Sequence, residues 1–531
     1  MTEETAKETF YITTAIPYMN AKLHLGQVYE FILADVTARF NKLQGKDTFF
    51  LTGSDEHGQK IYKSATSKGV SPQEYVDSMV ADMKRILVLY NISNDLFVRT
   101  TDASHEKVVQ GILTKLKENG DLYKGSYEGW YCVIDENFLT EAQLLEGKCP
   151  QCGREVDKIK EDNYFFKLSS YQDKLIKHIE ANPDFIIPES RKNEVLGLLK
   201  QGLKDISISR TTVTWGIPIP FDPGHFSYVW VDALINYISA LGYSLDNDAL
   251  FKKYWPADQQ HIGKDILKFH AVIWPAILMS IGVELPKHLA VHGWIMKGEE
   301  KLSKSKGITL DPDEMAESYG VDAVRYFFTR EITFGLDGSF TGQAMFKRYN
   351  GDLSNDFGNL VSRSVAMIDK YRGGVIPAKP VTLNGGKDFE KLWEDTKAAA
   401  INLFYNFSYS EYLVKIWDFI NIANKYIEDS KPWELAKSTG DVEAQKLDGV
   451  LYNLAESIRL SALFVFPFMP STCQRIFGQL GIDKNIEEMS FEADGKWGDF
   501  MGGTTVGKRE ILFPRIEENT KDKDGQKLVS G

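Results

Sequence analysis

A histidine and a glycine stand where an apolar strand is expected to lead into a helix, and together they could bind a phosphate. Residues 10–16 form an apolar, β-branched run, Pro17 ends it, and from Leu25 onward apolar residues recur at helical spacing. The first turn of a helix carries free N–H groups and partial positive charge, which attract an anion. Gly26 lets a nucleotide approach the backbone, and His24 can donate to a phosphate whose charge grows as pyrophosphate leaves. The alternative is a helix-capping histidine in an ordinary α/β domain.

Two lysines further along the chain could act on the same phosphates. Residues 296–307 read MKGEEKLSKSKG, so Lys301 and Lys304 lie three residues apart in a glycine-flanked loop. A mobile basic loop can close over a triphosphate and bind it more strongly as charge builds up. The alternative is a solvated lysine turn. The presence of His24 beside a parallel sheet favours the phosphate role.

An acidic residue follows the second predicted strand, residues 48–52. Asp55 lies within GSDEHG, residues 53–58. Ligands of open α/β sheets bind at the carboxyl ends of the strands, so Asp55 could hold an amino or a ribose hydroxyl group. The alternative is a helix N-cap.

A second histidine motif, HIGK at residues 261–264, looks more like a nucleotide signature than the first. It follows the polar residues 258–260 rather than a strong strand. We therefore do not assign it as a phosphate site of the same kind.

Cysteines near residue 140 predict a structural zinc site. Cys149-Pro-Gln-Cys152-Gly153 is a knuckle whose tight turn points two thiolates at one ion, and tetrahedral zinc needs four ligands. Cys132 supplies a third thiolate, and Asp135 stands where the fourth ligand of a paired C-x-x-C would fall. The alternative is a decayed site with free thiols.

The elements that must position these residues are a parallel sheet and its helices. Residues 10–52 predict strand, helix and strand, a unit too long for a hairpin, so the two strands should be parallel with a crossover helix. The segment 123–208 is glycine-rich, aromatic and β-prone, and we interpret it as an insertion between two halves of the sheet. Further helices are predicted over residues 72–90, 105–119, 228–241 and 265–279, and a strand over 288–294.

Two of these helices carry apolar and aromatic stripes. The first stripe is Trp230, Ala233, Leu234 and Tyr237, and the second is Ile266, His270, Ile273 and Trp274. Such stripes are usually plain core.

Beyond Gly342 the strand pattern ends and helical segments dominate. They cover residues 345–372, 389–430 and 442–480 and predict an α-helical bundle. The polar end of the chain, residues 517–531, predicts disorder.

Length and composition describe an ordinary globular protein of more than one domain. The chain has 531 residues, of which 43% are hydrophobic and 26% charged, with a net charge of −12. No run is long enough to span a bilayer, and the polar N-terminus lacks a signal core. Four cysteines indicate a reducing, cytoplasmic setting rather than a disulfide scaffold. The negative charge argues against nonspecific nucleic-acid coating but allows a local basic face.

In their order along the chain, these motifs resemble the methionyl-tRNA synthetase family of class I aminoacyl-tRNA synthetases. The resemblance extends from about residue 10 to residue 514. It rests on HLGQ, on KLSKS, and on four further segments: AIPYMN at 15–20, TGSDEHG at 52–58, YVWVDA at 228–233 and GKDI at 263–266.

The resemblance implies a set of binding residues. The methionine pocket would comprise Ile16, Tyr18, Asp55, Trp230, Ala233, Leu234, Tyr237, Ile266, His270, Ile273 and Trp274. ATP would contact His24, Gly26, Gln27, Lys301, Ser303, Lys304 and Ser305, with His24, Gln27, Lys301 and Lys304 serving catalysis. The anticodon would be read by Asn359, Arg363 and Trp433. An apolar, aromatic slot independently suits a thioether, and an aromatic can stack on an unpaired base.

The resemblance also implies a division of the chain. The expected parts are the first half of a Rossmann-like catalytic domain at 1–122, a connective insertion with a zinc-knuckle-like segment at 123–208, the second half at 209–295, a KMSKS-type loop and linker at 296–344, an α-helical anticodon-binding domain at 345–516 and a disordered tail at 517–531. Four positions depart from the family pattern: Gln27 stands for a histidine, Leu302 for a methionine, Asp135 for a cysteine and Ile273 for a bulkier aromatic residue.

The implied activity is a methionine–tRNA ligase. It would use Mg²⁺ with ATP and act on L-methionine and tRNA(Met), including the initiator tRNA, with Cys132, Asp135, Cys149 and Cys152 around Zn²⁺. We expect a monomer, because no added C-terminal tRNA-binding domain follows the bundle. Two alternatives remain: an adenylate-forming nucleotidyltransferase of the same superfamily and a non-catalytic tRNA-binding relative.

Overall fold

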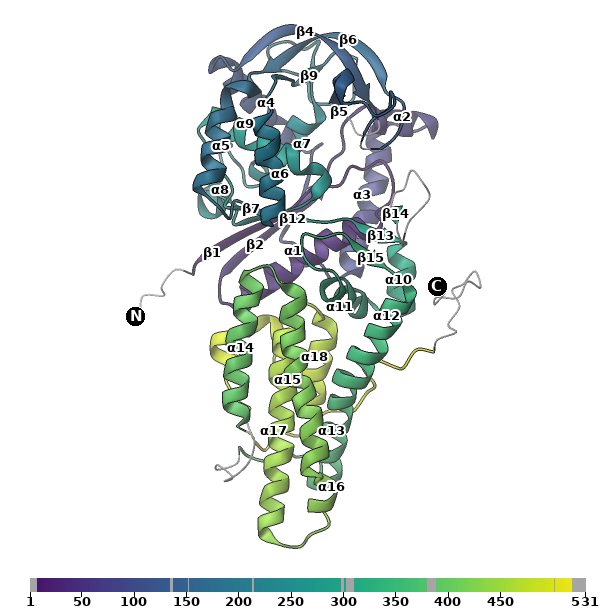
Figure 1. The fold of residues 1–531 in the computed structure, drawn as a ribbon, viewed down its shortest axis with the longest axis vertical. Helices are drawn as coiled ribbons and strands as arrows, with labels where there is room; N and C mark the ends of the chain where they lie inside the picture. Colours follow the sequence, from purple (N-terminus) through teal and green to yellow (C-terminus); the bar gives the residue numbers. More distant parts are fainter. Residues whose placement is uncertain are drawn as a thin grey trace.

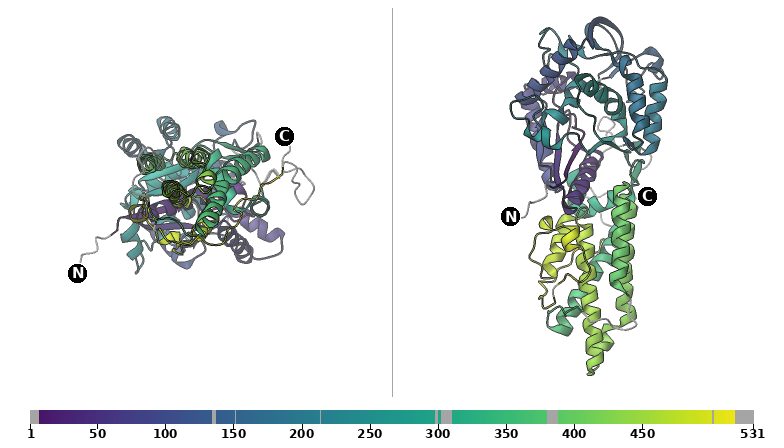
Figure 2. Two further views of the ribbon diagram at one scale, coloured as in Figure 1. Left: turned by 90° about the horizontal axis from the view of Figure 1, so that it is seen from below. Right: turned by 90° about the vertical axis from the view of Figure 1, so that its left-hand side faces the viewer.

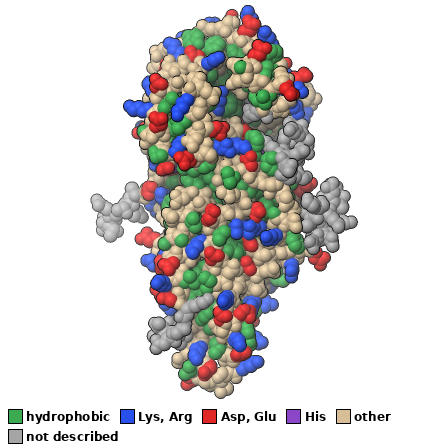
Figure 3. Space-filling view, in the orientation of Figure 1, with side chains coloured by type: hydrophobic (Ala, Val, Ile, Leu, Met, Phe, Trp, Pro, Cys, Tyr) green, Lys and Arg blue, Asp and Glu red, His purple; other side chains and the backbone are tan. Residues whose placement is uncertain are grey.

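The protein has two parts, one built on a parallel sheet and one built of helices, which follow each other along its long axis (Figure 1). The computed structural model describes residues 7–133, 137–150, 152–212, 214–297, 300–301, 310–379, 388–500 and 502–517. Within these ranges, no helix has both the length and the apolar character that crossing a membrane requires. Lys and Arg side chains are interspersed with Asp and Glu over the face shown in Figure 3.

A six-stranded parallel sheet forms the core of the first part, in the order β3-β2-β1-β11-β12-β7. The strands are β1 Thr9–Thr14, β2 Asp47–Ser54, β3 Leu96–Arg99, β7 Ile186–Ile187, β11 Gln259–Gly263 and β12 His288–His292. Strand β1 pairs in parallel with β2 on one side and β11 on the other. Helix α1, Leu25–Leu43, connects β1 to β2. The predicted parallel strand–helix–strand unit is therefore confirmed.

Strand β11 corrects our interpretation of the polar residues before HIGK. It is a central strand, paired in parallel with both β1 and β12. Gln260 and His261 have no exposed surface. Two flanking ladders and the helices on both faces override the low strand propensity of this run.

The helices of the first part cover the sheet and lead into the second part. They are α2 Gln59–Ser67, α3 Pro72–Leu89, α4 Ala103–Glu118, α5 Gln172–Ala181, α6 Glu189–Lys200, α7 Val229–Ser239, α8 Ala249–Tyr254 and α9 Trp274–Ile281. The helix predicted over 265–279 is irregular, because a 3₁₀ turn at Lys264–Ile266 and a π turn at Phe269–Ile273 precede α9. Pro275, in the first turn of α9, lacks the N–H that a regular α-helix would need there.

A smaller antiparallel sheet with the order β5-β4-β6-β8 lies at the far end of the first part (Figure 1). Its strands are β4 Leu122–Cys132, β5 Asn137–Leu139, β6 Asp157–Phe166 and β8 Ile206–Ser207. Strand β7, from the middle of the predicted insertion, joins the large sheet by pairing with β12. The segment 123–208 thus contributes both to its own sheet and to an edge of the main one.

Two small sheets and two helices complete the part of the chain that precedes the bundle. The elements are β9 Ser209–Arg210 with β10 Phe226–Ser227, then β13 Ile295–Lys297, β14 Glu300–Lys301 and β15 Gly338–Phe340, with helices α10 Pro312–Tyr319 and α11 Val321–Glu331.

The second part is a bundle of long helices (Figure 2). Its helices are α12 Gly342–Arg348, a π-helical stretch Tyr349–Gly358, α13 Asn359–Arg372, α14 Phe389–Tyr405, α15 Tyr409–Ser430, α16 Pro432–Leu435, α17 Asp441–Val465, α18 Pro470–Gln479 and α19 Phe491–Asp494. The helical segment predicted over 389–430 consists of two helices, because the chain turns at Phe407, whose φ is 58°. The segment 442–480 also divides, and Pro470 begins its second helix.

A buried arginine joins the two parts. Arg325 of α11 has no exposed surface and donates to the carbonyl oxygens of Tyr90, Pro467 and Phe468 at 2.8–3.0 Å. It also donates to Asp35 of α1 at 2.6 Å. One cluster of buried apolar side chains runs from α1 into the bundle helices. Helix α1 is therefore packed between the sheet and the bundle.

Candidate active site

The start of α1 lies at the carboxyl end of β1. His24 is the N-cap residue, with extended backbone at φ −119° and ψ 164°. The side-chain oxygen of Gln27 accepts from the His24 backbone N–H at 3.2 Å. Gln27 therefore fixes the helix start, a role that our sequence reasoning did not assign. The Leu25 N–H donates to Leu310 O at 3.2 Å, which ties the chain after the lysine loop to this turn.

The described residues on either side of the lysine loop are anchored in the fold. Strand β14 pairs with β13 through Met296 and Lys301, and β13 pairs with β15. The Lys301 side chain lies outside the described structure, as do Leu302, Ser303, Lys304 and Ser305. Leu310, the first described residue after this segment, lies at the start of α1.

Glu30 and His292 form a buried pair next to this edge, which the sequence did not reveal. Glu30 Oε1 accepts from the Ala15 N–H at 2.7 Å, and Oε2 lies 2.9 Å from His292 Nε2. His292 Nδ1 faces Gly293 O at 2.8 Å, so Nδ1 carries a proton. Burial acts to lower the pKa of His292, but the hydrogen bond and charge of Glu30 raise it above its ordinary value. The pair fixes the ends of β1 and β12 to α1.

Asp55 is held by its backbone on the segment after β2. Its N–H donates to Pro17 O at 3.0 Å, and its carbonyl accepts from Met19 N at 2.9 Å. Asp55 and Tyr18 form an isolated parallel bridge, and Asp55 is 9% exposed. These backbone contacts hold Asp55 beside the segment that follows the first strand.

The two aromatic stripes lie next to each other in one cluster of buried apolar side chains. Trp230 of α7 stacks on Phe269 with ring centroids 3.7 Å apart. Tyr237 lies 5.9 Å from Trp274 between centroids. The indole N–H groups of Trp230 and Trp274 are buried and have no hydrogen-bond partner among the described residues. An aromatic wall with few polar groups suits an unbranched, polarisable side chain.

Tyr237 and His270 supply the polar feature of this wall. Tyr237 Oη lies 2.7 Å from His270 Nε2, and His270 Nδ1 lies 3.0 Å from Ile266 O. Burial lowers the pKa of His270 to about 4. The imidazole is therefore neutral near pH 7, with its proton on Nδ1 and Nε2 accepting from the tyrosine.

The contacts just described connect Trp230 to Phe269, Tyr237 to His270 and Trp274, and His270 to Ile266. Of the other predicted pocket residues, Ala233 and Leu234 lie on α7, Ile273 lies in the π turn, and Ile16 and Tyr18 follow β1. All of them are buried or half-buried.

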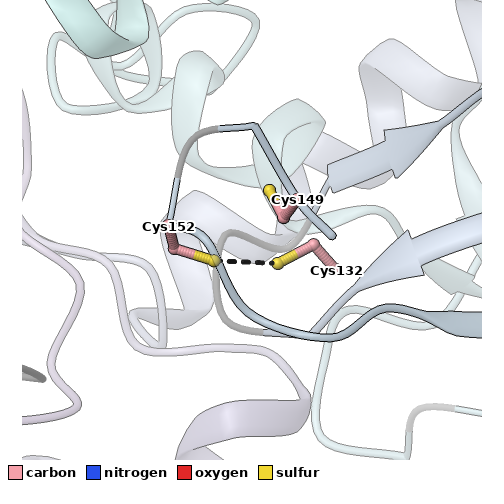
Figure 4. A group of neighbouring side chains, drawn as sticks. All are labelled: Cys132, Cys149 and Cys152. Atoms are coloured by element: carbon pink, nitrogen blue, oxygen red, sulfur yellow. Dashed lines mark hydrogen bonds between the residues drawn. The ribbon is translucent and has the colours of Figure 1, made fainter. Parts of the chain in front are cut away.

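The cysteine cluster lies at the tip of the small sheet. Cys132 ends β4, and the Sγ atoms of Cys132, Cys149 and Cys152 all lie within 4.8 Å of one another (Figure 4). The Sγ atoms of Cys132 and Cys152 are 3.5 Å apart. Asp135, the predicted fourth ligand, lies outside the described residues. Three converging thiols are the donor set that zinc prefers.

An open groove of about 620 Å³ runs between α2 and this cysteine-bearing tip. Its lining includes Lys60, Lys63 and Arg154, together with Glu155 and Asp157. It is a partly basic surface near the candidate active site.

The three predicted base-reading residues belong to the far end of the bundle. Asn359 begins α13, and Arg363 on the same helix pairs with Glu428 at 2.7 Å. Trp433 lies on α16, the short helix near the distal tip (Figure 1). All three are half-buried, so part of each side chain faces solvent.

Comparison with known proteins agrees with this geometry. The sequence matches the family described as tRNA synthetases class I (M) over residues 10–160 and 154–365. It is 50% identical over 511 residues to the methionine–tRNA ligase of Caldanaerobacter subterraneus subsp. tengcongensis, covering 96% of this chain and 79% of that protein. It is 46% identical over 524 residues to that of Thermotoga maritima, with coverage of 98% and 82%.

Solved structures agree as well. The fold matches Mycobacterium tuberculosis methionyl-tRNA synthetase in complex with methionyl-adenylate, with a TM-score of 0.92 and 41% identity, covering 96% of this chain and 100% of that one. The apo form of that synthetase matches with a TM-score of 0.86 and 38% identity, covering 97% of this chain and 99% of that one.

Proposed function

The chain belongs to the methionine-specific class I tRNA synthetases, and from this premise we propose how its residues carry out the reaction. The enzyme activates L-methionine with ATP to methionyl-adenylate and pyrophosphate, then transfers the methionyl group to tRNA(Met), including the initiator tRNA. ATP enters with Mg²⁺. The observation that supports the residue assignments is that the start of α1, Asp55 and His270 follow the carboxyl ends of β1, β2 and β11 of one parallel sheet, with Tyr237 hydrogen-bonded to His270.

In the first step, Asp55 holds the ammonium of methionine by a charge-assisted hydrogen bond. The thioether lies against Trp230, Tyr237 and Trp274. The methionine carboxylate attacks the α-phosphate of ATP in line, and pyrophosphate leaves. No protein nucleophile is needed, because positioning and electrostatic stabilisation supply the rate.

Two groups of residues stabilise the negative charge that develops on the phosphates. His24 and the N–H groups of the first turn of α1, at Gly26, approach from the helix. Lys301 and Lys304, with Ser303 and Ser305, close from the loop. Gln27 contributes indirectly, because its side chain fixes the position of His24.

In the second step, the terminal ribose 2′-OH of tRNA attacks the adenylate carbonyl and AMP leaves. We assign anticodon reading to Asn359, Arg363 and Trp433, with Trp433 stacking on a base and the other two reading base edges. Their distance from the sheet suits a tRNA that spans both parts of the molecule.

We assign a structural zinc ion to Cys132, Cys149 and Cys152. The support is the convergence of three sulfur atoms within 4.8 Å in a small apolar cluster. Asp135 would complete the tetrahedron. The ion would brace the tip of the small sheet and takes no part in the reaction.

The domain assignment keeps the catalytic domain at 1–122 and 209–295, the insertion at 123–208, the linker at 296–344 and the anticodon-binding domain at 345–516. We further propose that the protein is cytoplasmic and monomeric. Size-exclusion chromatography with light scattering measures the mass in solution and so tests the monomer.

The deciding experiment is ATP–pyrophosphate exchange with each standard amino acid, followed by charging of tRNA. Exchange with methionine alone and charging of tRNA(Met) are the expected results. Exchange without charging would favour an adenylate-forming enzyme that does not use tRNA. Binding of tRNA without exchange would favour a non-catalytic relative.

A further inference from the structure

A buried carboxylate outside the reaction centre accepts a hydrogen bond on each of its oxygens from a different histidine. Asp232 Oδ2 lies 2.7 Å from His57 Nδ1, and Oδ1 lies 2.7 Å from His105 Nε2. Asp232 and His105 are each 1% exposed and His57 is 4% exposed. The mechanism above uses none of the three.

The positions of the protons follow from the partners. Ser239 Oγ lies 2.7 Å from His105 Nδ1 and 3.3 Å from Asn236 O. We assign its single proton to the shorter contact, so that the hydroxyl donates to Nδ1. His105 then carries its proton on Nε2 and donates it to Asp232, while His57 donates from Nδ1. Burial acts to raise the pKa of Asp232, but the two imidazoles lower it below its ordinary value. Asp232 is therefore an ionised carboxylate that accepts two N–H groups.

These three residues connect separate elements of the candidate site. His57 lies two residues after Asp55 on the segment that follows β2. Asp232 lies on α7 beside Ala233, within the helix that carries Trp230 and Tyr237. His105 lies on α4 and forms hydrogen bonds with two residues of α7, Asp232 and Ser239, which are two helical turns apart.

The segment that carries Asp55 is also held from the side of the sheet. Trp215 Nε1 donates to Glu56 O at 2.6 Å, and the Gly58 N–H donates to Trp215 O at 3.0 Å. The Glu56 side chain pairs with Arg99 of β3 at 2.7 Å. The His57–Asp232 hydrogen bond adds the link to α7 and so sets the distance between Asp55 and the aromatic wall.

We propose that Asp232 is a positioning residue for methionine: through His57 it holds the Asp55 segment at a fixed distance from the α7 pocket. The inference rests on the proposed roles of Asp55 and of that pocket. The two histidine hydrogen bonds require a carboxylate at position 232, because an asparagine amide offers one accepting group and one donating group. Its NH₂ group would meet the N–H of one imidazole.

The test is Asp232→Asn in methionine-dependent ATP–pyrophosphate exchange. We expect the KM for methionine to rise about tenfold, while the KM for ATP and kcat at saturating methionine change by less than about threefold. A residue with only a structural role would reduce the active fraction, so kcat would fall with both KM values unchanged. That pattern would overturn the proposal.

Substitution of His57 provides a second test, in which Asp232 on α7 is unchanged. His57→Ala should raise the KM for methionine. In His57→Asn the amide N–H can take the place of Nδ1–H, so its KM for methionine should be much closer to that of the wild type. Equal KM values in the two variants would contradict the link. Glu456→Gln is the matched control, because Glu456 is equally buried, pairs with Arg459 in the bundle and should leave the KM for methionine unchanged.

The outcomes separate this inference from the proposed function. Methionine-dependent exchange by the wild-type protein with an unchanged KM in Asp232→Asn and His57→Ala would remove the positioning role alone. No exchange by the folded wild-type protein would overturn both.

Discussion

Tyr237 Oη lies 2.7 Å from His270 Nε2 between the two aromatic stripes, although the residues belong to different elements. Because His270 Nδ1 faces the Ile266 carbonyl, the tyrosine hydroxyl must be the donor to Nε2. The tyrosine oxygen then presents its remaining lone pair, rather than its proton, to a ligand.

Replacing Tyr237 by phenylalanine should weaken methionine binding while preserving the fold. The ring stays, but Nε2 of the buried His270 loses its donor, which costs about 1–2 kcal/mol. We expect the KM for methionine in pyrophosphate exchange to rise about tenfold. Tyr412→Phe is the control, because that buried hydroxyl donates to Phe464 O within the bundle and should affect stability only. An unchanged KM in Tyr237→Phe would remove this residue from the pocket.

Replacing Lys304 by alanine should slow activation without affecting methionine binding. Leu310, which follows the loop, accepts a hydrogen bond from the Leu25 N–H at the start of α1, and the charge of Lys304 should matter most as pyrophosphate leaves. We expect kcat for exchange to fall about a hundredfold, while the methionine Kd from calorimetry without ATP stays the same. Lys200→Ala, on the exposed end of α6, is the control. Near-normal exchange in Lys304→Ala would show that the loop assignment is wrong.

Stability should be greatest near pH 6.5 and fall on either side. Burial lowers the pKa of His261 to about 3 and that of His270 to about 4. Between pH 6.5 and 4 the unfolded chain therefore takes up protons that the folded chain does not, which favours unfolding by several kcal/mol at about 1.4 kcal/mol per pKa unit. His57 and His292 have the opposite effect on the pH dependence of stability. Their carboxylate partners raise the pKa of each, so their stabilisation is complete below pH 6.5 and is lost as the pH rises.

The thermal midpoint measured from pH 4.5 to 9 tests this prediction. The lower limit avoids the range in which most carboxylates titrate. In His261→Asn the fall in midpoint between pH 6.5 and 4.5 should be smaller than in the wild type. An identical fall in both would mean that His261 does not contribute.

The sequence was informative wherever local pattern and structure coincide. The β1–α1–β2 unit and the two aromatic stripes follow from periodicity, and the stripes do lie next to each other. Periodicity could not reveal β11, because Gln259 and Gln260 owe their strand conformation to neighbours on both sides rather than to propensity. It also missed the break at Phe407, where a single left-handed residue divides one long apolar pattern.

The polar pairs that organise the candidate site were beyond local reasoning. Glu30 and His292 lie 262 residues apart, and Asp232 and His57 lie 175 apart. One sequence signal was available: Asp232 is an acidic residue within the apolar run VWVDALINY, which implies a buried partner. Nothing in the sequence indicates which histidine that partner is.

The cysteine cluster should hold one zinc ion per chain. Three sulfur atoms within 4.8 Å of one another match the ligand set of a structural zinc site. Elemental analysis should give about one zinc in the wild type, and Cys149→Ser should lose it. Cys473→Ser is the control, because the fourth cysteine is buried in α18 of the bundle. Metal-free wild-type protein with four titratable thiols would contradict the assignment.

Replacing Trp433 by alanine should affect charging but not activation. The residue lies on α16 at the distal end of the bundle, far from the sheet, and loss of a stacked base costs about 1–3 kcal/mol. We expect kcat/KM for tRNA(Met) to fall between about fivefold and a hundredfold, with methionine-dependent exchange unchanged. Trp433→Phe should retain most of the activity. A tRNA with an altered anticodon provides the decisive comparison, because Trp433→Ala should cost little further activity on a transcript that has already lost the base contact. Equal losses on both transcripts would place the effect of Trp433 in the stability of the bundle rather than in base recognition.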